Sequence, residues 1–505
     1  MEKVLQKWNT IVKQKWFHIT LIILGSIFIL LGAFHTEVWY DEAYTMYLVR
    51  HDYADIIRID SGDVHPVLYY LLLKTFTMPF NNSILACRLF SAIPAILLGI
   101  LGYTHIRKDF GEKVGVAYTF LMFFLPFVAM YAMEIRMYTW TMLFVTLTGI
   151  YAYRIVKKYR IKNWILFAIF SLLAAHCHYY GLATVALING LLFFYILFSK
   201  KMYEENQVSK KKYIITFFIM AVIQVLGYLP WVFVFLKQAQ AVSKGYWIPL
   251  NLAETVAAPL GIQFNGRLNI PISVVFTLIM YAYFIFQIVC LKKQKKNLGV
   301  VWFCLLAHFG IYFAMLLITV LIKPIMYHRY MLIPTGILMF AFAYCLANND
   351  TKKQKIFSCV VVMIILGLSI YNNSMIVIEN YDPSNGEEIR FLQENYQEGD
   401  MILYQDIYQG PNVMVHFPEY NQYLYHIDPN HDVKPFENFS PPTKIIFDEE
   451  TLKNYTGRII LIDNAELQFY NEIIKKYDVK EIERKTTRPR YRSLTYQFVI
   501  VEKNS

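Results

Sequence analysis

The sequence predicts a polytopic α-helical membrane protein that ends in a small α/β domain, and three observations support this prediction. The 505 residues are 56% hydrophobic and only 17% charged, whereas roughly a quarter of the residues of a soluble domain are charged. Long apolar runs recur until about residue 380, after which the chain is polar and interrupted by Pro, Gly and Asn. We therefore expect a transmembrane module over residues 1–379 and a soluble domain over residues 380–505.

About eleven of the apolar runs are long enough to cross a bilayer, which takes about 20 apolar residues. The expected spans lie near residues 17–34, 84–105, 114–131, 138–155, 163–178, 180–199, 213–236, 270–291, 299–322, 330–347 and 356–373. No small-residue cleavage site follows the first of them, so we expect it to remain in the protein.

The basic residues predict the orientation of the chain. Half of the 48 Lys and Arg residues fall in six short segments, and these follow every second expected span, with the N-terminus included. Cytoplasmic loops are enriched in Lys and Arg. The pattern predicts a cytoplasmic N-terminus in the cell membrane and, with an odd number of spans, an extracytoplasmic C-terminal domain; an even number is the alternative. Because topology accounts for the net charge of +11, the charge does not predict nucleic-acid binding.

The soluble domain carries the pattern of a small α/β fold. The stretches GDMILYQD and RIILID are expected as buried strands, and NAELQFYNEIIKKY is expected as a helix. The six cysteines all lie in or beside the expected spans. Their positions predict neither a disulfide framework in this domain nor a metal site of cysteine type.

The unusual polar clusters of the transmembrane module all fall in loops expected at the outer membrane face. Polar groups near a membrane are costly and are often functional. Their convergence predicts an outward-facing cavity at the boundary between water and lipid. The clusters are YDEAY, DVHP, YAMEIRMY, HCHYYG, KPIMYHRY and the long segment 237–269.

Asp41 and Glu42 stand side by side directly after the first span. Residues 44–57 carry apolar side chains at helical spacing, which predicts an amphipathic helix on the membrane surface with both carboxylates at its N-terminus. Asp41 then suits an N-cap, and Glu42 complements the helix dipole. A carboxylate held there can equally accept a proton from an incoming hydroxyl, and the sequence leaves the two interpretations open.

The other outer clusters offer further acids, cations and histidines. Arg136 near Glu134 suits phosphate binding, with a snorkelling side chain as the alternative. His176 and His178 suggest a metal, but a site takes three or more ligands and interface anchoring is the alternative. A divalent metal cofactor therefore stays open, and no cofactor is certain. The other candidates are Asp63, His65, Tyr138 and Arg329.

Taken together, these motifs resemble the superfamily of protein O-mannosyltransferases and lipid A aminoarabinose transferases, membrane glycosyltransferases of the GT-C fold. The resemblance covers residues 1 to about 350 and rests on motifs in the right order. They are WYDEAYT, DVHPVLYYLLLKTF, CRLFSAIPAIL, YAMEIRMY, HYYG and HRY. It implies juxtamembrane helices in the first outer loop. It also implies sugar transfer, with inversion, from a polyprenyl-phosphate donor of undecaprenyl-phosphate type to an acceptor hydroxyl outside the membrane.

The resemblance also implies roles for particular residues. Asp41 matches the family's first acid, which acts as base or orients the acceptor, and Glu42 follows it as in the family. Glu134 matches the second acidic segment, and these three are the expected catalytic residues. His65 stands where lipid A transferases tend to have Lys before a Pro-Pro pair, which is Pro66 and Val67 here. The residues expected to bind substrate are Asp63, His65, Arg136, Tyr138, His178, Tyr179, Arg329 and Tyr330.

The chemistry of the outer face agrees with these roles. An acceptor hydroxyl needs a base, and a leaving phosphate needs positive charge or hydrogen-bond donors where its charge develops. A transporter, a receptor or another lipid-phosphate transferase is the alternative class of function. The expected partners are a lipid-linked sugar donor, membrane lipids and an acceptor lipid, cell-wall polymer or protein.

Overall fold

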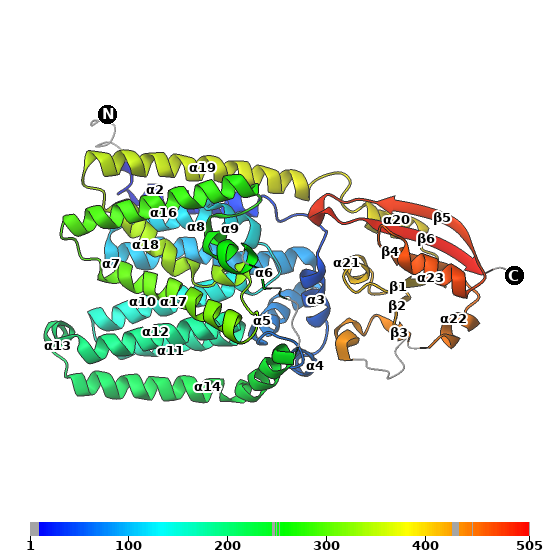
Figure 1. Cartoon of the computed structure of the whole chain (residues 1–505), viewed down its shortest axis with the longest axis horizontal. Helices are drawn as coiled ribbons and strands as arrows, with labels where there is room; N and C mark the ends of the chain where they lie inside the picture. Colours follow the sequence, from blue (N-terminus) through cyan, green and yellow to red (C-terminus); the bar gives the residue numbers. More distant parts are fainter. Residues whose placement is uncertain are drawn as a thin grey trace. The chain divides into compact units, whose positions relative to one another are not determined.

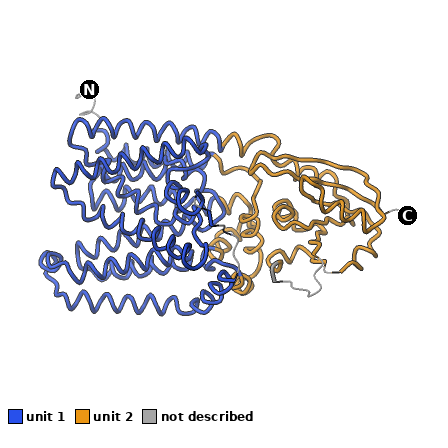
Figure 2. Tube along the Cα trace, in the orientation of Figure 1, with its two compact units in different colours: residues 1–31, 63–69, 89–376 blue, residues 32–62, 70–88, 377–505 orange. Residues whose placement is uncertain are grey.

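A computed structural model describes residues 10–244, 248, 250–251, 253–426, 434–446 and 448–503. The chain divides into two compact units, coloured separately in Figure 2. Unit 1 comprises residues 1–31, 63–69 and 89–376, and unit 2 comprises residues 32–62, 70–88 and 377–505. Two short segments that follow the first apolar helix thus cluster with the C-terminal residues. The boundary at residue 379 between membrane and soluble regions stays a prediction.

Unit 1 is a bundle of helices, several of which run alongside one another in Figure 1. In it α10 packs against α11, α11 against α12 and α14, and α12 against α17. Helices α6 and α19 of the set below extend across the unit boundary. In chain order the helices are α2 (Lys15–Leu30), α6 (Ile84–Leu101), η2 (Gly102–Ile106), α7 (Arg107–Phe110), α8 (Glu112–Phe124), α9 (Pro126–Tyr131), α10 (Tyr138–Lys157), α11 (Ile161–Cys177), α12 (Tyr179–Phe198), α13 (Lys200–Asn206), α14 (Lys210–Lys244), η3 (Ala253–Ala257), α15 (Ala258–Gly261), η4 (Ile262–Phe264), α16 (Ile270–Lys293), α17 (Gly299–Leu321), η5 (His328–Leu332), α18 (Thr335–Ala347) and α19 (Lys352–Asn380).

Helix length and composition support a multi-pass membrane protein. Among the described residues, 6 helices are long and apolar enough to cross a membrane, and three shorter apolar helices accompany them. Large apolar side chains such as Phe233 and Phe313 are exposed on these helices, as expected where lipid covers them. Every apolar run expected to span the membrane is largely helical. The number of spans stays a prediction.

Two expected spans are interrupted. The run at 114–131 breaks at Leu125, whose backbone is extended (φ −74°, ψ 138°) between α8 and α9. A proline disfavours helical backbone in the preceding residue, and Pro126 follows Leu125 directly. The run at 330–347 begins as the 3₁₀ turn η5, and α18 starts only after Pro334. Hydropathy alone predicts neither break because both lie within apolar sequence.

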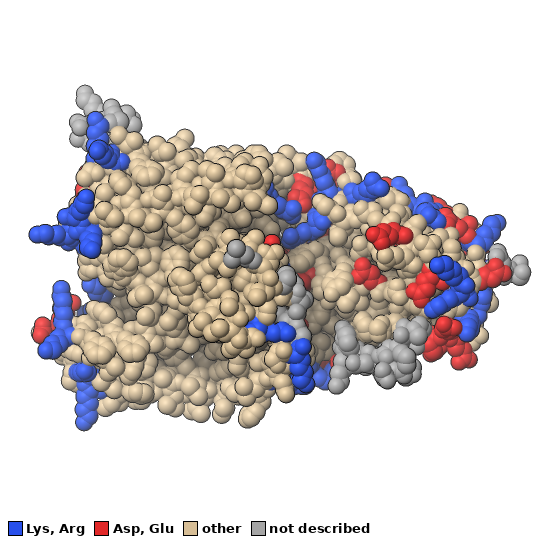
Figure 3. Space-filling view, in the orientation of Figure 1, with Lys and Arg blue, Asp and Glu red and all other residues tan. Residues whose placement is uncertain are grey.

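The basic loops lie at one end of the unit 1 bundle. Figure 3 shows Lys and Arg side chains gathered there and little charge along the sides of the helices. The basic end holds the last turn of α10 and the short helix α13, whereas Tyr138 and Tyr179 begin α10 and α12 at the other end. This arrangement agrees with the expected separation of basic and functional loops, and the orientation of the termini stays a prediction.

A reporter experiment tests that orientation. We expect alkaline phosphatase, which is active only outside the cytoplasm, to be active when fused after Asn380 and inactive when fused after Lys211, because basic loops remain cytoplasmic. A fluorescent protein that matures only in the cytoplasm should give the reverse pattern at the same two positions. Activity of alkaline phosphatase at both positions would contradict the predicted number of spans.

Unit 2 contains a six-stranded sheet. The strand order is β3-β2-β1-β4-β6-β5, in which β1, β2, β3 and β4 run parallel and β6 is antiparallel to both β4 and β5. The elements of this region are α20 (Glu387–Asn395), β1 (Met401–Tyr404), α21 (Gly410–Met414), β2 (Gln422–Tyr425), η6 (Lys434–Phe439), β3 (Lys444–Ile446), α22 (Glu450–Asn454), β4 (Ile459–Asp463), α23 (Gln468–Lys476), β5 (Val479–Thr487), η7 (Tyr491–Ser493) and β6 (Tyr496–Lys503).

Alternating side chains give the sheet two apolar faces. Ile402 and Tyr404 of β1 belong to one buried cluster, and Met401 and Leu403 belong to the other. Successive side chains of a strand point to opposite faces, so β1 is buried on both sides, as is usual for parallel strands. The predicted strands GDMILYQD and RIILID and the predicted helix α23 are all present, and the expected fold class is confirmed.

The segments 32–62 and 70–88 contribute α3 (Tyr40–Leu48), α4 (Tyr53–Asp60), most of α5 (Leu68–Thr77) and η1 (Met78–Phe80). Helix α3 packs against η6 and α21. Its Tyr40 ring lies 4.6 Å from that of Tyr408, and its Tyr47 ring lies 5.3 Å from that of Phe439. Hydrogen bonds add to this packing, because the Tyr47 hydroxyl donates to Gln422 Oε1 at 3.4 Å.

Candidate functional site

Several of the predicted site residues of unit 1 lie around the ring of His178, which is 2% exposed. The ring centroid of His178 lies 5.2 Å from that of His65, 5.8 Å from that of Tyr138 and 5.0 Å from that of Tyr330. These residues come from four separate parts of the sequence. We call the group His65, Arg136, Tyr138, His178, Arg329 and Tyr330 the His178 cluster. Glu134 is buried and lies two residues before Arg136 in the sequence.

The hydrogen bonding of His178 decides which of its nitrogens carries a proton. Its Nδ1 accepts from the backbone N–H of Tyr180 at 3.0 Å, which caps α12. A neutral imidazole has one acceptor and one donor nitrogen, so Nε2 carries the proton. That Nε2 is buried and makes no hydrogen bond with any described residue. The ring therefore presents a fixed donor to a ligand.

Two arginines bring positive charge to this cluster. Arg136 is 5% exposed and lies in the bent segment between α9 and α10, where its N–H donates to the Glu134 carbonyl at 2.6 Å. The Arg329 guanidinium lies over the rings of Tyr138 and Tyr327, at 5.7 and 5.1 Å from their centroids. Contacts with an aromatic face help to hold a guanidinium in place.

The positive charge affects His65 directly. Burial, followed by Arg136, His178 and Arg329, lowers the pKa of the His65 ring well below its ordinary value. His65 is therefore neutral at physiological pH and serves as a hydrogen-bonding group rather than a charge. The family that this chain resembles tends to have Lys at this position. Having His there therefore replaces a positive charge with a neutral hydrogen-bonding group.

Three predicted residues take other positions. The Tyr179 hydroxyl donates to Gln238 and accepts from the Trp231 indole at 3.2 Å, so Tyr179 faces α14. His176 bonds the Gly227 carbonyl at 3.2 Å, which separates it from His178. Asp63 is half-buried in the loop that leads to His65. Within the described ranges no group of three or more His, Cys, Asp or Glu side chains could hold a metal ion.

Asp41 and Glu42 lie in unit 2, in the first turn of α3. The expected continuous helix over 44–57 is wrong: α3 ends at Leu48, and a new helix, α4, starts after its N-cap Asp52. The interpretation of Asp41 as the N-cap is wrong, because Trp39 occupies the N-cap and Glu42 Oε2 accepts its N–H at 3.4 Å. The half-buried Asp41 side chain is therefore not committed to capping.

Glu42 is fully buried in a network that the sequence did not predict. Arg88 Nη1 donates to its Oε1 at 3.0 Å, and the Tyr491 hydroxyl donates to its Oε2 at 3.3 Å. Arg88, which is 2% exposed, also donates to the Glu37 carbonyl at 2.5 Å. Arg88 could have been recognised in the sequence, because it is a single charged residue at the start of the apolar run CRLFSAIPAIL. No local signal points to Tyr491, since 449 positions separate it from Glu42.

Comparisons with known proteins agree with this geometry. Residues 64–231 match the family model described as Dolichyl-phosphate-mannose-protein mannosyltransferase. That segment includes the His178 cluster apart from Arg329 and Tyr330. No curated protein matches the chain in sequence.

Two solved structures have the same fold. The chain is similar to ArnT from Cupriavidus metallidurans in the apo state, with a TM-score of 0.59, and to the same protein bound to undecaprenyl phosphate, with a TM-score of 0.60. In both comparisons the identity is 10%, with 96% of this chain and 97% of the other covered. Together with the family match, this fold confirms the predicted resemblance to the superfamily of protein O-mannosyltransferases and lipid A aminoarabinose transferases.

Proposed function

We propose that this protein transfers a sugar from a polyprenyl-phosphate carrier to an acceptor hydroxyl at the outer face of the membrane, with inversion at the anomeric carbon. The His178 cluster is the observation that carries the proposal. Two arginines, a fixed Nε2–H donor and tyrosine hydroxyls suit a phosphate, and charge-assisted bonds of this kind are the strong ones. The similarity of the whole chain to a protein solved with undecaprenyl phosphate supports a donor of that type.

In the proposed reaction the acceptor oxygen forms a bond to the anomeric carbon while the bond from that carbon to the phosphate oxygen breaks. Polyprenyl phosphate leaves with the bonding electron pair, and positive charge from Arg136 and Arg329 stabilises it. The proton of the acceptor hydroxyl passes to a carboxylate, for which we propose Asp41. Displacement in a single step inverts the anomeric configuration.

The other predicted residues take supporting roles in this proposal. His65 and His178 donate hydrogen bonds to the phosphate as neutral rings, and Tyr138 and Tyr330 surround it. Glu134, two residues before Arg136, orients either the guanidinium or the sugar. Asp63 and Tyr179 help to bind the substrate from positions beside the cluster. Glu42, paired with Arg88, positions the first turn of α3 rather than reacting itself.

A panel of lipid-linked sugars tests the proposal. We expect purified protein incubated with radiolabelled polyprenyl-phosphate sugars and membrane extract to release free polyprenyl phosphate with one donor class. The labelled product then identifies the acceptor as a lipid, a cell-wall polymer or a protein. Transfer of the whole phosphosugar, with no free polyprenyl phosphate released, would instead identify another lipid-phosphate transferase.

The role of Arg136 gives a sharper prediction. We expect Arg136→Lys to lose most of its transfer activity while the protein stays folded, because a point charge does not replace a planar two-pronged donor. Arg329→Ala should raise the Kd for the donor. Donor binding and initial rates at saturating donor are the measurements.

Arg154→Lys is the matched control for Arg136→Lys. Arg154 pairs with Asp109 at 2.7 Å at the other end of α10, where Lys can keep the pairing, so its rate should stay near that of the wild type. Near-normal turnover by Arg136→Lys would show that Arg136 is structural and that other groups hold the phosphate.

A further inference from the structure

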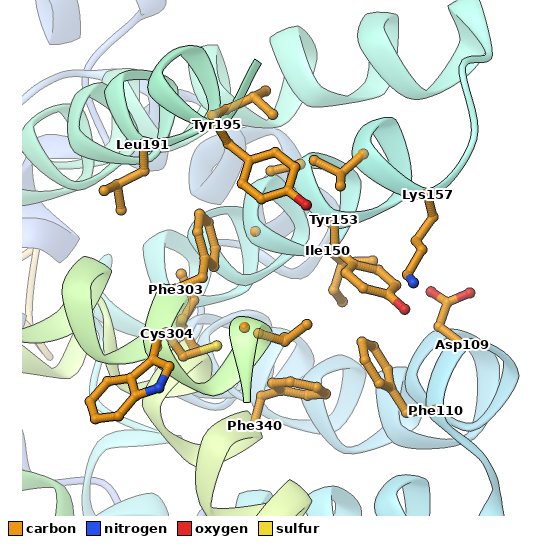
Figure 4. Close-up of a pocket in the computed structure, with 18 of the residues that line it drawn as sticks. Asp109, Phe110, Ile150, Tyr153, Lys157, Leu191, Tyr195, Phe303, Cys304 and Phe340 are labelled. Carbon is orange, nitrogen blue, oxygen red and sulfur yellow. The ribbon is translucent and has the colours of Figure 1, made fainter. Parts of the chain in front are cut away.

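Unit 1 contains a cavity of about 530 Å³ at its basic end. The size lies within the range of about 300–1,000 Å³ that is usual for small-molecule sites. Figure 4 shows its walls, which α10, α12, α17 and α18 supply together with α7. Tyr138 of the His178 cluster and Tyr153 of this cavity lie at opposite ends of α10, about 22 Å apart along the helix axis. The cavity is therefore a second site.

The exposure of lining side chains on α12 and α17 indicates that the cavity opens between these helices, toward the side of the bundle. These helices touch at Gly310, where an added Cβ would lie only 2.8 Å from Leu187 Cδ2. Further toward the basic end, Tyr195 of α12 and Trp302 of α17 line the cavity while remaining 48% and 49% exposed. In a membrane-spanning bundle such a lateral opening faces the hydrocarbon of the bilayer, so a lipid chain can enter without crossing water.

The interior of the cavity matches a hydrocarbon chain. Its walls are mostly apolar or aromatic, and the labelled Ile150, Phe303 and Phe340 point into it in Figure 4. The Phe110 ring lies 4.7 Å from that of Phe340 and 4.5 Å from that of Tyr153. Aromatic contacts of this kind keep the walls in place, so the cavity does not depend on a ligand to hold it open.

One end of the cavity is polar and contains a lysine ammonium group that can bind an anionic ligand. Asp109 is paired with Arg154, and Glu205 with Lys201 at 3.5 Å, so both acids at this end are neutralised. Lys157 also lines the cavity and lies over the Tyr153 ring at 5.8 Å. It makes no hydrogen bond or ion pair with another described residue. The surrounding loops are basic (Figure 3), which favours an anionic head group.

We propose that this cavity binds a phosphate-headed membrane lipid, with one hydrocarbon chain among α10, α12, α17 and α18 and the phosphate at Lys157. Annular lipid that merely coats the bundle needs neither a cavity within the bundle nor a cation at the end of that cavity. The proposal is independent of sugar transfer, so its test does not use transfer activity.

Photo-crosslinking lipids test the proposal on the full-length protein in detergent. Three probes carry a diazirine in the chain: a diacyl phospholipid, a polyprenyl phosphate and a diacylglycerol without phosphate. We expect one of the phosphate-headed probes to label peptides from residues 146–157, 191–202 and 299–306, and the one that does so identifies the source of the lipid. Diacylglycerol should label them weakly. Equal labelling by diacylglycerol, or no labelling of these peptides by any probe, would overturn the proposal.

Different variants test the binding of the head group and the binding of the hydrocarbon chain. Lys157→Glu removes an attraction and adds a repulsion, so labelling should fall on the order of tenfold. Leu191→Trp fills the cavity and should also abolish labelling, provided its melting temperature matches the wild type; Ile150→Phe is a smaller filling variant. Lys158→Glu is the control, since this neighbouring lysine is exposed and does not line the cavity. Loss of labelling in Lys158→Glu equal to that in Lys157→Glu would leave only general electrostatic attraction and overturn the site.

Discussion

Asp41→Asn is expected to bind the donor and remain folded but to lose its transfer activity. General base catalysis is worth about 10²–10⁴-fold, so the transfer rate should fall by that factor when the carboxylate becomes an amide. The fold should tolerate the change, because Trp39 and not Asp41 caps α3. The interaction of the charge with the helix dipole is lost, which costs about 0.3–1 kcal/mol.

Transfer rate, donor affinity and melting temperature should be measured on the same preparations. Asp52→Asn is the matched control, since Asp52 caps α4 by accepting the Asp55 N–H at 2.8 Å and Asn caps about as well as Asp. That variant should have near-normal activity. A folded Asp41→Asn protein with near-wild-type transfer would exclude Asp41 as the base and make Glu134 the next candidate.

The transmembrane helices could be predicted because their signal is local. Continuous apolar sequence at the length of a bilayer favours helix wherever it occurs, and every expected run is largely helical. The breaks within two of the expected spans came from local backbone effects that mean hydropathy does not measure. Pro126 interrupts the helix at Leu125 through a clash with the preceding backbone. The buried strands of unit 2 were predictable for the same local reason.

The candidate site was predictable only in part, because its residues meet through the tertiary fold. The sequence placed Arg136, His178 and Arg329 in loops at one end of the helices, and the structure brings all three into one cluster. It did not predict the network around Glu42, whose partner Tyr491 lies near the other end of the chain. Nor did it predict that α3 packs on the C-terminal elements, since ring contacts such as Tyr40 with Tyr408 leave no periodic pattern.

Breaking the Glu42–Arg88 pair is expected to destabilise the protein more than any other single change considered for unit 2. Both side chains are buried, at 0% and 2% exposure, and are 3.0 Å apart. Removing one partner of such a pair leaves an uncompensated buried charge and costs about 3–5 kcal/mol. Glu42→Leu should therefore lower the melting temperature strongly. Glu42→Gln should do so too, because the amide keeps the shape but leaves the charge of Arg88 unpaired.

A double-mutant cycle isolates the pair. Glu42→Leu with Arg88→Met removes both charges, so its loss of stability should be clearly smaller than the sum of the two single losses. The surface pair of Glu481 and Arg484, 2.5 Å apart and roughly one-third exposed, is the control, and breaking it should cost about 0–1 kcal/mol. Additive losses, or a Glu42→Leu protein no less stable than the surface variant, would contradict the assignment. Because Asp41 shares the first turn of α3 with Glu42, a positioning role predicts that transfer falls with Glu42→Leu and partly recovers in the double variant. If Glu42 were itself the base, transfer would be lost equally in both.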